Sequence, residues 1–405
     1  MKHLILLTYG IFSIISCSST PKADKTNVLD FELEKIAQQG IFNGFSVAIV
    51  NDKGSLYQNG FGFADASSRK PYTENTIQNI ASVSKTFVGI ALMKAQELGK
   101  LDLDDPINKY LPFAVFNPNF PDDQITIRQL ANHTSSIQDN EIYSTKNYIL
   151  KSGQDLTGMQ LMFDDEQLFN SSEEKISMQE FFENSLTSNG KWFHENAFTR
   201  QRPGSIYEYS NVGTALAAYI VELAAQQSFY DFTEQYITKP LKMKSSGWRF
   251  QDIDFTKYSK LYENPLKELP YYEMITYPDG GFITSAEDLS KFLSELIKGY
   301  NGKGTLLSKE SYAEYFKPQL SVSNFTDRNE SNPYSESYNV GIFIGYGYTD
   351  YIGHTGGDPG VMSMMFFDPK TNYGRIMIFN TNFSDKKGND TFYRIWDLLE
   401  KYQGN

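Results

Sequence analysis

Apolar residues recur at helical spacing near both ends of the chain. Leu29, Leu33 and Ile36 lie four and three positions apart, and Gly40 follows them. This spacing predicts an amphipathic helix that stops before the glycine. A second amphipathic helix is predicted near the C-terminus, where four apolar residues fall at i, i+3, i+4 and i+7: Phe392, Ile395, Trp396 and Leu399.

Two segments join β-branched or aromatic runs through short turns, which is typical of β-hairpins. Residues 44–65 contain the turn NDKG, and residues 361–382 contain the connection DPKTNYG. Between them, residues 82–298 show mainly helical and loop patterns. We therefore predict an α/β fold of the α+β type, in which one antiparallel sheet built from both chain ends is flanked by helices and carries an inserted helical lobe. A groove between the sheet and the lobe is the expected place for a site.

The most apolar helical pattern follows a serine and a lysine. Residues 79–98 read NIASVSKTFVGIALMKAQEL, and no charged residue lies between Phe87 and Met93, so a helix here is expected to be buried on every side. Ser82 and Lys85 are three positions apart and would share one face of that helix. Because a buried amine loses proton affinity, Lys85 is suited to accept the Ser82 proton.

The spacing S-x-x-K does not single out Ser82 by itself. Only Ser82 opens a long apolar helix, whose N-terminal N–H groups would also stabilise an oxyanion. The alternative is that Ser82 merely caps a core helix. The same spacing begins at five other serines: Ser19, Ser67, Ser172, Ser188 and Ser384.

Two further motifs carry groups that serine acyl transfer needs. Tyr209-Ser210-Asn211 precedes an apolar helical segment and offers a hydroxyl and an amide at a loop-to-helix junction. His354-Thr355-Gly356-Gly357 follows the end of a predicted strand. Y-x-N also occurs at Tyr57 and Tyr262, so the pattern alone is not decisive.

The order of these motifs, with S-x-x-K first, Y-x-N second and H-T-G last, resembles the penicillin-recognising serine hydrolases. The resemblance is strongest to the branch that holds class C β-lactamases, D-Ala-D-Ala carboxypeptidases, D-aminopeptidases and family VIII esterases. Residues 125–137, ITIRQLANHTSSI, and residues 280–293, GGFITSAEDLSKFL, also match this branch. The resemblance implies a β-lactamase or DD-peptidase-like fold and an acyl-enzyme mechanism without a cofactor.

The same resemblance implies a role for each motif residue. Ser82 would attack the substrate carbonyl, Lys85 would accept its proton, and Tyr209 would act as a base or proton relay. Asn211 would orient Lys85 and a substrate amide. The backbone N–H groups of Ser82 and Gly357 would form the oxyanion hole. The strand beside the substrate would consist of His354, which stands where many relatives have lysine, with Thr355, Gly356 and Gly357.

Two features depart from the family's pattern. Ser136 stands where relatives often have glycine. The turn at this position is therefore expected either to match that of the relatives or to differ from it. No lysine or arginine lies between Arg328 and His354, so this part of the sequence supplies no cation for a substrate carboxylate. This absence favours an ester, amide or amine-terminated substrate. The alternative is that a cation from another segment folds into place. Asp358 is either a turn residue before Pro359 or a partner for a substrate amine.

Composition excludes several other classes of function. With 405 residues and 15% aromatic residues, the chain has ample material for a core of one or two lobes. A net charge of −12 argues against a nucleic-acid partner. No P-loop or Rossmann fingerprint appears. A metal site is disfavoured because the four histidines show no ligand spacing: His3, His133, His194 and His354.

The N-terminus has the pattern of a secretory signal. Lys2 precedes an apolar stretch that reaches Cys17, the only cysteine, and the segment IISC resembles a lipoprotein lipobox. We predict a signal peptide over 1–17, lipid on Cys17 and a tether over 18–27. The hydrolase domain follows over 28–390, and the C-terminal helix over 391–405 belongs to the same domain. The protein would then be lipid-anchored in a bacterial envelope. The alternative is an ordinary signal peptide with an incidental cysteine.

Two questions stay open at the level of sequence. Residues 138–172 are polar and weakly periodic, which indicates a long loop or partial helix beside the groove, or a surface insertion. The expected activity is that of a serine hydrolase acting on a small-molecule or peptide ester, amide or peptide bond. A D-Ala-D-Ala carboxypeptidase, a β-lactamase and a catalytically silent penicillin-binding-like sensor are the alternatives.

Overall fold

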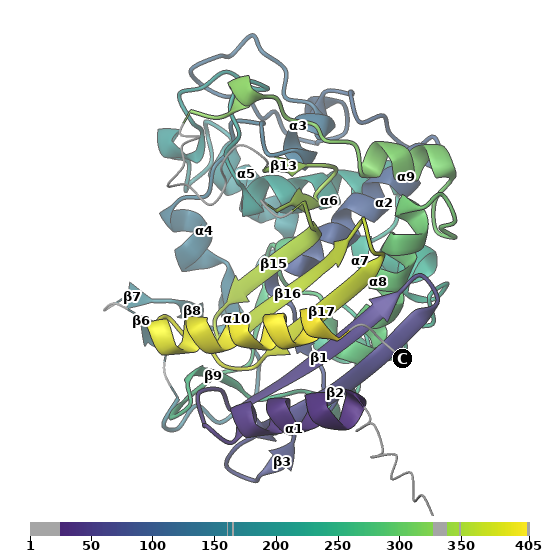
Figure 1. Ribbon diagram of the computed structural model, residues 1–405. Coiled ribbons are helices and arrows are strands. Elements are labelled where there is room, and N and C mark those ends of the chain that lie inside the picture. The colour runs from purple at the N-terminus through teal and green to yellow at the C-terminus, as the bar shows by residue number, and fades with distance from the viewer. Residues whose placement is uncertain (1–24, 160, 164–165, 327–337, 348–349, 403–405) are drawn as a thin grey trace, which may run out of the picture.

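A computed structural model describes residues 25–159, 161–163, 166–326, 338–347 and 350–402. Its centre is an eight-stranded antiparallel sheet in the order β13-β14-β15-β16-β17-β1-β2-β3 (Figure 1). These strands span Asn339–Val340, Gly345–Tyr346, Ile352–Asp358, Val361–Asp368, Tyr373–Phe379, Gly44–Asn51, Gly54–Asp65 and Lys70–Pro71, in the same order. The sheet therefore combines the first and last parts of the chain, as the hairpin patterns predict.

The junction of the two hairpins lies in the middle of the sheet. β1 pairs with β17 in antiparallel register, so that Phe45 lies opposite Phe379 and Val47 lies opposite Met377. All four side chains are buried. The two predicted hairpins are β1–β2 and β16–β17, and both are confirmed.

Two helices cover one face of this sheet, α1 (Lys25–Ala37) and α10 (Lys386–Lys401) (Figure 1). The apolar residues predicted to form the inner faces of both helices are buried and pack with Phe45 and Phe379. Both helices begin earlier than the sequence pattern suggests. The last three residues of the predicted tether, 25–27, form the first turn of α1, and α10 starts before residue 391.

On the opposite face, α8 (Ala286–Tyr300) packs against β1, β2 and β17. The predicted helical lobe spans residues 82–298, which include most of α8. In the structure α8 instead packs directly on the sheet. Behind it lies α2 (Lys85–Glu97), which contacts α6 (Asn211–Ala225) and α9 (Lys309–Tyr315). Every side chain from Lys85 to Met93 is buried, which confirms the expectation of a helix enclosed on all sides.

The remaining helices and strands are short. The segment 138–172 holds one helix and several two- or three-residue strands, so it is more ordered than a long loop. The short helices are α3 (Ile127–Ala131), α4 (Glu141–Lys146), α5 (Met178–Leu186) and α7 (Phe229–Thr233). The short strands are β4 (Gln78–Asn79), β5 (Tyr148–Leu150), β6 (Met162–Phe163), β7 (Glu166–Gln167), β8 (Phe169–Asn170), β9 (Leu261–Asn264), β10 (Lys267–Leu269), β11 (Tyr272–Met274) and β12 (Ile283–Thr284).

Ser136 adopts a left-handed φ of 66°, the region that favours glycine. The backbone at Ser136 therefore has the conformation that a glycine at this position would favour. Within the described part of the chain, no helix combines the length and the apolarity needed to cross a membrane.

Candidate active site

Ser82 lies in a tight turn directly before the buried helix. The turn η1 (Ala81–Ser84) is a 3₁₀ turn, and α2 begins only at Lys85. Ala81 has a left-handed φ of 46°, which costs energy for any residue with a Cβ and is typical of functional sites. The turn leaves the Ser82 side chain half-buried, whereas Lys85 is fully buried. The nucleophile candidate is thus accessible and its amine neighbour is not.

The Lys85 amine has three polar partners. Its Nζ lies 3.0 Å from Ser82 Oγ, 2.6 Å from Asn211 Oδ1 and 2.7 Å from the backbone oxygen of Asp279. The last two can only accept. A neutral amine satisfies all three contacts by donating to Asn211 and Asp279 and accepting from the Ser82 hydroxyl. Burial lowers the pKa of Lys85, opposed by the charges of nearby aspartates, so the environment favours this neutral form.

Tyr209 is the second residue that contacts Ser82 Oγ. Its hydroxyl donates to Ser82 Oγ at 2.9 Å, and its ring centroid lies 5.1 Å from Lys85 Nζ. Burial raises the pKa of Tyr209 well above the usual value. The resting phenol is therefore protonated and suited to give a proton to a leaving group. Of the two roles that the sequence left open, this geometry favours relay over base.

Asn211 is held by a residue that the sequence analysis missed. Asp139 Oδ2 accepts hydrogen bonds from the Asn211 backbone N–H at 3.0 Å and from its side-chain amide at 2.8 Å. Asp139 Oδ1 accepts from the N–H of Val212 at 2.9 Å. The carboxylate thus binds the N-terminus of α6, where N–H groups lack partners inside the helix.

The third motif forms the strand β15 beside the nucleophile turn. A Cβ built on Gly356 would lie 2.5 Å from the backbone oxygen of Ile80 and 3.0 Å from the Cβ of Ala81, so only glycine permits this approach. A Cβ on Gly357 would meet only Met362, at 3.7 Å. The N–H of Ser82 belongs to the 3₁₀ turn η1, near its N-terminal end, where N–H groups lack partners within the turn, and it is a candidate oxyanion donor.

His354 is a neutral residue in this strand. Burial lowers its pKa to about 4, with a further contribution from the charge of Lys85. Its Nδ1 lies 2.5 Å from the backbone oxygen of Thr355, and because that oxygen only accepts, the ring proton is assigned to Nδ1. Near neutral pH, His354 therefore does not supply the positive charge that a lysine would.

Carboxyl groups surround the Lys85 amine. The charges that act on it belong to Asp279, Asp139 and Asp358. Burial raises the pKa of Asp279 to about 8 and that of Asp358 to about 6. Asp358 is the last residue of β15, and its Oδ1 accepts a hydrogen bond from the Tyr148 hydroxyl at 2.8 Å. Three carboxyl groups therefore act on the site, beside a third motif whose preceding sequence has no lysine or arginine back to Arg328.

Spacing could not reveal Asp139 or Asp279. Asp139 lies 72 positions before Asn211 in a segment without periodicity. Asp279 contributes a backbone oxygen, which leaves no trace in residue type. A buried lysine and a tyrosine that both contact an accessible serine, with a glycine-containing strand alongside, are the groups expected of a serine hydrolase with the β-lactamase fold. No group of three or more His, Cys, Asp and Glu that could hold a metal occurs among the described residues.

The chain belongs to the beta-lactamase family, whose model matches residues 32–400. Members of this family include serine hydrolases. The fold is similar to that of a penicillin-binding protein homologue from Pyrococcus abyssi, with a TM-score of 0.70 and 20% identity over 93% of this chain and 78% of that one. It is also similar to the D-amino acid amidase from Ochrobactrum anthropi SV3, with a TM-score of 0.67 and 20% identity over 93% and 99% of the two chains.

Relatives by sequence include proteins with more residues than this chain. Protein flp of Staphylococcus aureus is 23% identical over 369 residues, which are 89% of this chain and 64% of that protein. The human mitochondrial serine beta-lactamase-like protein LACTB is 25% identical over 396 residues, covering 83% and 70% of the two chains. The chain thus spans about 64% of the length of the flp proteins.

Proposed function

We propose that this protein is a hydrolase that forms a covalent acyl intermediate on Ser82. The observation that carries the proposal is the position of Ser82 Oγ, 3.0 Å from Lys85 Nζ and 2.9 Å from the Tyr209 hydroxyl. Acyl transfer requires a base and a proton donor that both contact the nucleophilic hydroxyl.

The reaction would proceed in two halves. As Ser82 Oγ forms a bond to the substrate carbonyl carbon, the hydroxyl proton passes to Lys85 Nζ. The tetrahedral intermediate then loses its leaving group, which takes a proton from Tyr209, and Tyr209 regains one from Lys85. A water molecule hydrolyses the Ser82 ester in the second half and restores the hydroxyl.

The substrate class follows from the charges around the site. His354 is neutral, and the environment of Lys85 also favours its neutral form. Neither residue therefore offers a fixed positive charge to a free substrate carboxylate beside β15. Buried carboxyl groups instead favour an ester, an amide or a substrate with an amine. A structural neighbour named as a D-amino acid amidase supports the amide and amine reading.

Labelling with a fluorophosphonate tests the acyl-enzyme step. Intact-mass measurement should show one adduct on the wild type and none on Ser82→Ala. Ser67→Ala is the matched control, because Ser67 has the same S-x-x-K spacing in an exposed position. An unlabelled wild type would instead support a catalytically silent sensor, and an adduct that persists equally on Ser82→Ala would rule out Ser82 as the labelled nucleophile.

A substrate panel tests the charge argument. Nitrocefin, a diacetyl-Lys-D-Ala-D-Ala peptide, D-Ala-p-nitroanilide and p-nitrophenyl acetate are compared on one preparation. We expect kcat/KM to be higher for the ester and the amine-bearing anilide than for the two carboxylate-bearing substrates. The reverse order would identify the protein as a carboxypeptidase or β-lactamase.

We also propose that lipid on Cys17 anchors the protein to a membrane of a bacterial envelope. Cys17 lies outside the described residues, so this proposal rests on the lipobox pattern. A radioactive or clickable fatty-acid analogue should label the wild type and leave Cys17→Ala unlabelled. Equal labelling of both forms would rule out this anchor.

A further inference from the structure

Asp358 has a carboxylate oxygen without a partner beside the Ser82 site. The residue is half-buried, and its Oδ1 accepts from the hydroxyl of the buried Tyr148 at 2.8 Å. Among the described residues, no group donates to Oδ2 and no cation pairs with it, and this oxygen is not enclosed. One oxygen is therefore fixed by a tyrosine, while the other can be reached by a cationic group.

Asp358 lies on the face of β15 that meets the nucleophile turn. Side chains two positions apart in a strand share a face, so His354, Gly356 and Asp358 project from β15 in the same direction. A Cβ built on Gly356 would lie 3.0 Å from the Cβ of Ala81, the residue before Ser82. The nucleophile turn is thus opposite the middle of this face, with His354 toward one end and Asp358 at the other.

Gly280 links Asp358 to the contact that holds Lys85. A Cβ on Gly280 would lie 2.7 Å from Asp358 Oδ2, so this oxygen lies directly against Gly280. The preceding residue, Asp279, accepts from Lys85 Nζ through its backbone oxygen at 2.7 Å. Asp358 is also one of the carboxyl groups whose charge acts on Lys85. A group bound at Oδ2 would therefore lie within the Ser82 site.

The position of Tyr209 assigns the two ends of this face. Its ring centroid lies 6.2 Å from that of His354. Because Tyr209 would give its proton to the leaving group, the leaving group lies toward His354, and the acyl group extends toward Asp358. From His354 to Asp358, β15 pairs only with β16 in the described part of the chain, so its other edge is open to an extended substrate.

The two ends also differ in charge. Burial raises the pKa of Asp358 only to about 6, so its carboxylate is ionised near neutral pH. His354 is neutral under the same conditions. An amine in the acyl group would therefore meet a negative charge, whereas a cation in the leaving group would meet an uncharged imidazole.

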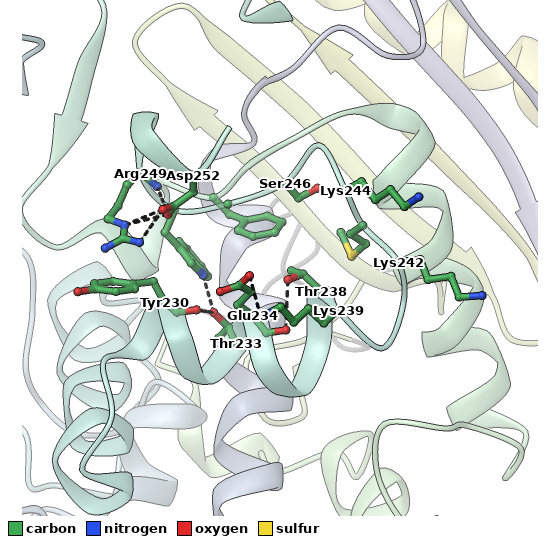
Figure 2. A pocket seen from close by; sticks show the side chains of 14 residues that line it. Tyr230, Thr233, Glu234, Thr238, Lys239, Lys242, Lys244, Ser246, Arg249 and Asp252 are labelled. Carbon is green, nitrogen blue, oxygen red and sulfur yellow. Dashed lines mark hydrogen bonds and ion pairs between the residues drawn. The ribbon is translucent and has the colours of Figure 1, made fainter. Parts of the chain in front are cut away.

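The cavity beside α7 offers no comparable group. It has a volume of about 440 Å³ and is bounded by α7, by the π-helical turn η5 (Glu234–Thr238) and by the loop 239–252 (Figure 2). Its aromatic residues Trp248 and Phe282 have exposed fractions of only 5% and 0%, and the amines of Lys242 and Lys244 point away from it. Substrate recognition is therefore assigned to the Ser82 site and not to this cavity.

We propose that Asp358 selects substrates whose acyl group carries a protonated amine, as in amides and esters of amino acids with a free amino group. Asp358 Oδ2 would accept a hydrogen bond from the ammonium group while Tyr148 holds Oδ1. This role rests on the proposed hydrolase function, because the leaving-group side is assigned through Tyr209.

Two substrates that differ only in the acyl amine test this role. D-Ala-p-nitroanilide has a free amine, and N-acetyl-D-Ala-p-nitroanilide has the same leaving group without it. Both L-enantiomers are measured alongside, so that stereochemistry does not decide the result. We expect wild-type kcat/KM to be roughly ten-fold higher or more for the free amine. Asp358→Asn, which is uncharged but can still accept from Tyr148, should remove most of this preference and leave kcat/KM for p-nitrophenyl acetate unchanged.

Two controls separate a role on the acyl side from a general loss of activity. Asp368→Asn changes the last residue of β16, whose carboxylate accepts from the Lys370 N–H and the Thr371 hydroxyl in its own turn. This variant should keep the wild-type preference. Acetylthiocholine carries its cation in the leaving group, so Asp358→Asn should hydrolyse it as fast as the wild type does.

A role for Asp358 in selecting the acyl group is excluded by any of four results. These are a wild type without preference for the free amine, an Asp358→Asn variant that keeps the preference, an equal loss on all substrates, and a loss on acetylthiocholine as large as on the anilide. Each leaves the proposed function intact if a fluorophosphonate labels wild-type Ser82. A wild type that is neither labelled nor active on any of these substrates would overturn the proposed function, and this role with it.

Discussion

Asp139 fixes the direction in which the Asn211 side chain points. Its carboxylate accepts from the Asn211 backbone N–H at 3.0 Å and from the side-chain amide at 2.8 Å. With the amide nitrogen held there, Asn211 Oδ1 faces Lys85 Nζ at 2.6 Å. Asp139 is therefore a positioning residue, which acts on the lysine through the asparagine.

Asp139→Ala should reduce both stability and turnover. Three N–H groups lose their acceptor, which costs about 1–3 kcal/mol, and Asn211 no longer holds Lys85, so kcat should fall roughly ten-fold or more. Asp385→Ala is the matched control, because Asp385 caps α10 by accepting from the Gly388 N–H at 2.6 Å. It should lower the melting temperature without changing kcat. Equal kcat in both variants would remove Asp139 from the positioning role.

Lys85→Ala and Tyr209→Phe should each lower kcat by roughly two orders of magnitude or more, because each removes one side of the proton path to and from Ser82. Substrate affinity should change less. Lys94→Ala, near the end of the same helix, is the control, since its amine pairs with Glu97 at 2.7 Å rather than with the site. An unchanged kcat in a correctly folded variant, checked by circular dichroism, would exclude that residue from the mechanism.

Asp279 should make the protein less stable as pH rises. Burial raises its pKa from 3.8 to about 8, so between these values the folded state holds a proton that the unfolded chain has lost. The free energy of unfolding therefore decreases with pH across this window. Asp279→Asn cannot ionise, and its melting temperature relative to the wild type should increase between pH 5 and pH 8. Asp122→Asn, at an exposed position, should show no such trend. Parallel curves for Asp279→Asn and the wild type would contradict this prediction.

Gly356→Ala and Gly357→Ala should differ in stability although the glycines are adjacent. A Cβ at Gly356 would lie 2.4 Å from Ser363 Oγ and 2.5 Å from the Ile80 oxygen, so β15 or the nucleophile turn must shift. We expect a loss of about 1–3 kcal/mol. A Cβ at Gly357 makes only an ordinary contact. Equal denaturant midpoints for the two variants would show that the strand does not depend on this close approach.

His354→Lys should shift the preference toward carboxylate-bearing substrates. A lysine would place a cation on β15, where the present histidine is neutral. The ratio of kcat/KM for the diacetyl-Lys-D-Ala-D-Ala peptide to that for p-nitrophenyl acetate should rise roughly ten-fold. His354→Gln, which is uncharged, should leave the ratio unchanged. The same ratio in both variants would mean that charge at this position does not select the substrate.

Local patterns in the sequence were sufficient to predict much of the fold. β-branched and aromatic runs joined by turn sequences located β1–β2 and β16–β17. Helical spacing identified the buried residues of α1 and α10, because that spacing depends on which face meets the core. The start of α2 was placed too early. Ser82 belongs to a separate 3₁₀ turn that follows the left-handed φ of Ala81, and residue type at Ala81 gives no sign of that backbone conformation.

The candidate site was predictable only where side-chain type carries the chemistry. Ser82, Lys85 and Tyr209 could be chosen from the order of their motifs, and the structure brings them within hydrogen-bonding distance. Asp139 could not, because its partner lies 72 positions away. The contact from Lys85 to the Asp279 backbone oxygen was not predictable either, because every residue has a backbone oxygen.

The pairing of β1 with β17 has a consequence for synthesis of the chain. The N–H of Asn43, just before β1, bonds to the Thr381 side chain, 338 residues later. At about 5–20 residues per second, a ribosome needs on the order of half a minute to complete that stretch. Until then one edge of the β1–β2 hairpin has no partner strand, and an open edge can pair with other chains. The unfinished polypeptide therefore depends on being kept from aggregation, and a fragment that ends before β17 should not fold.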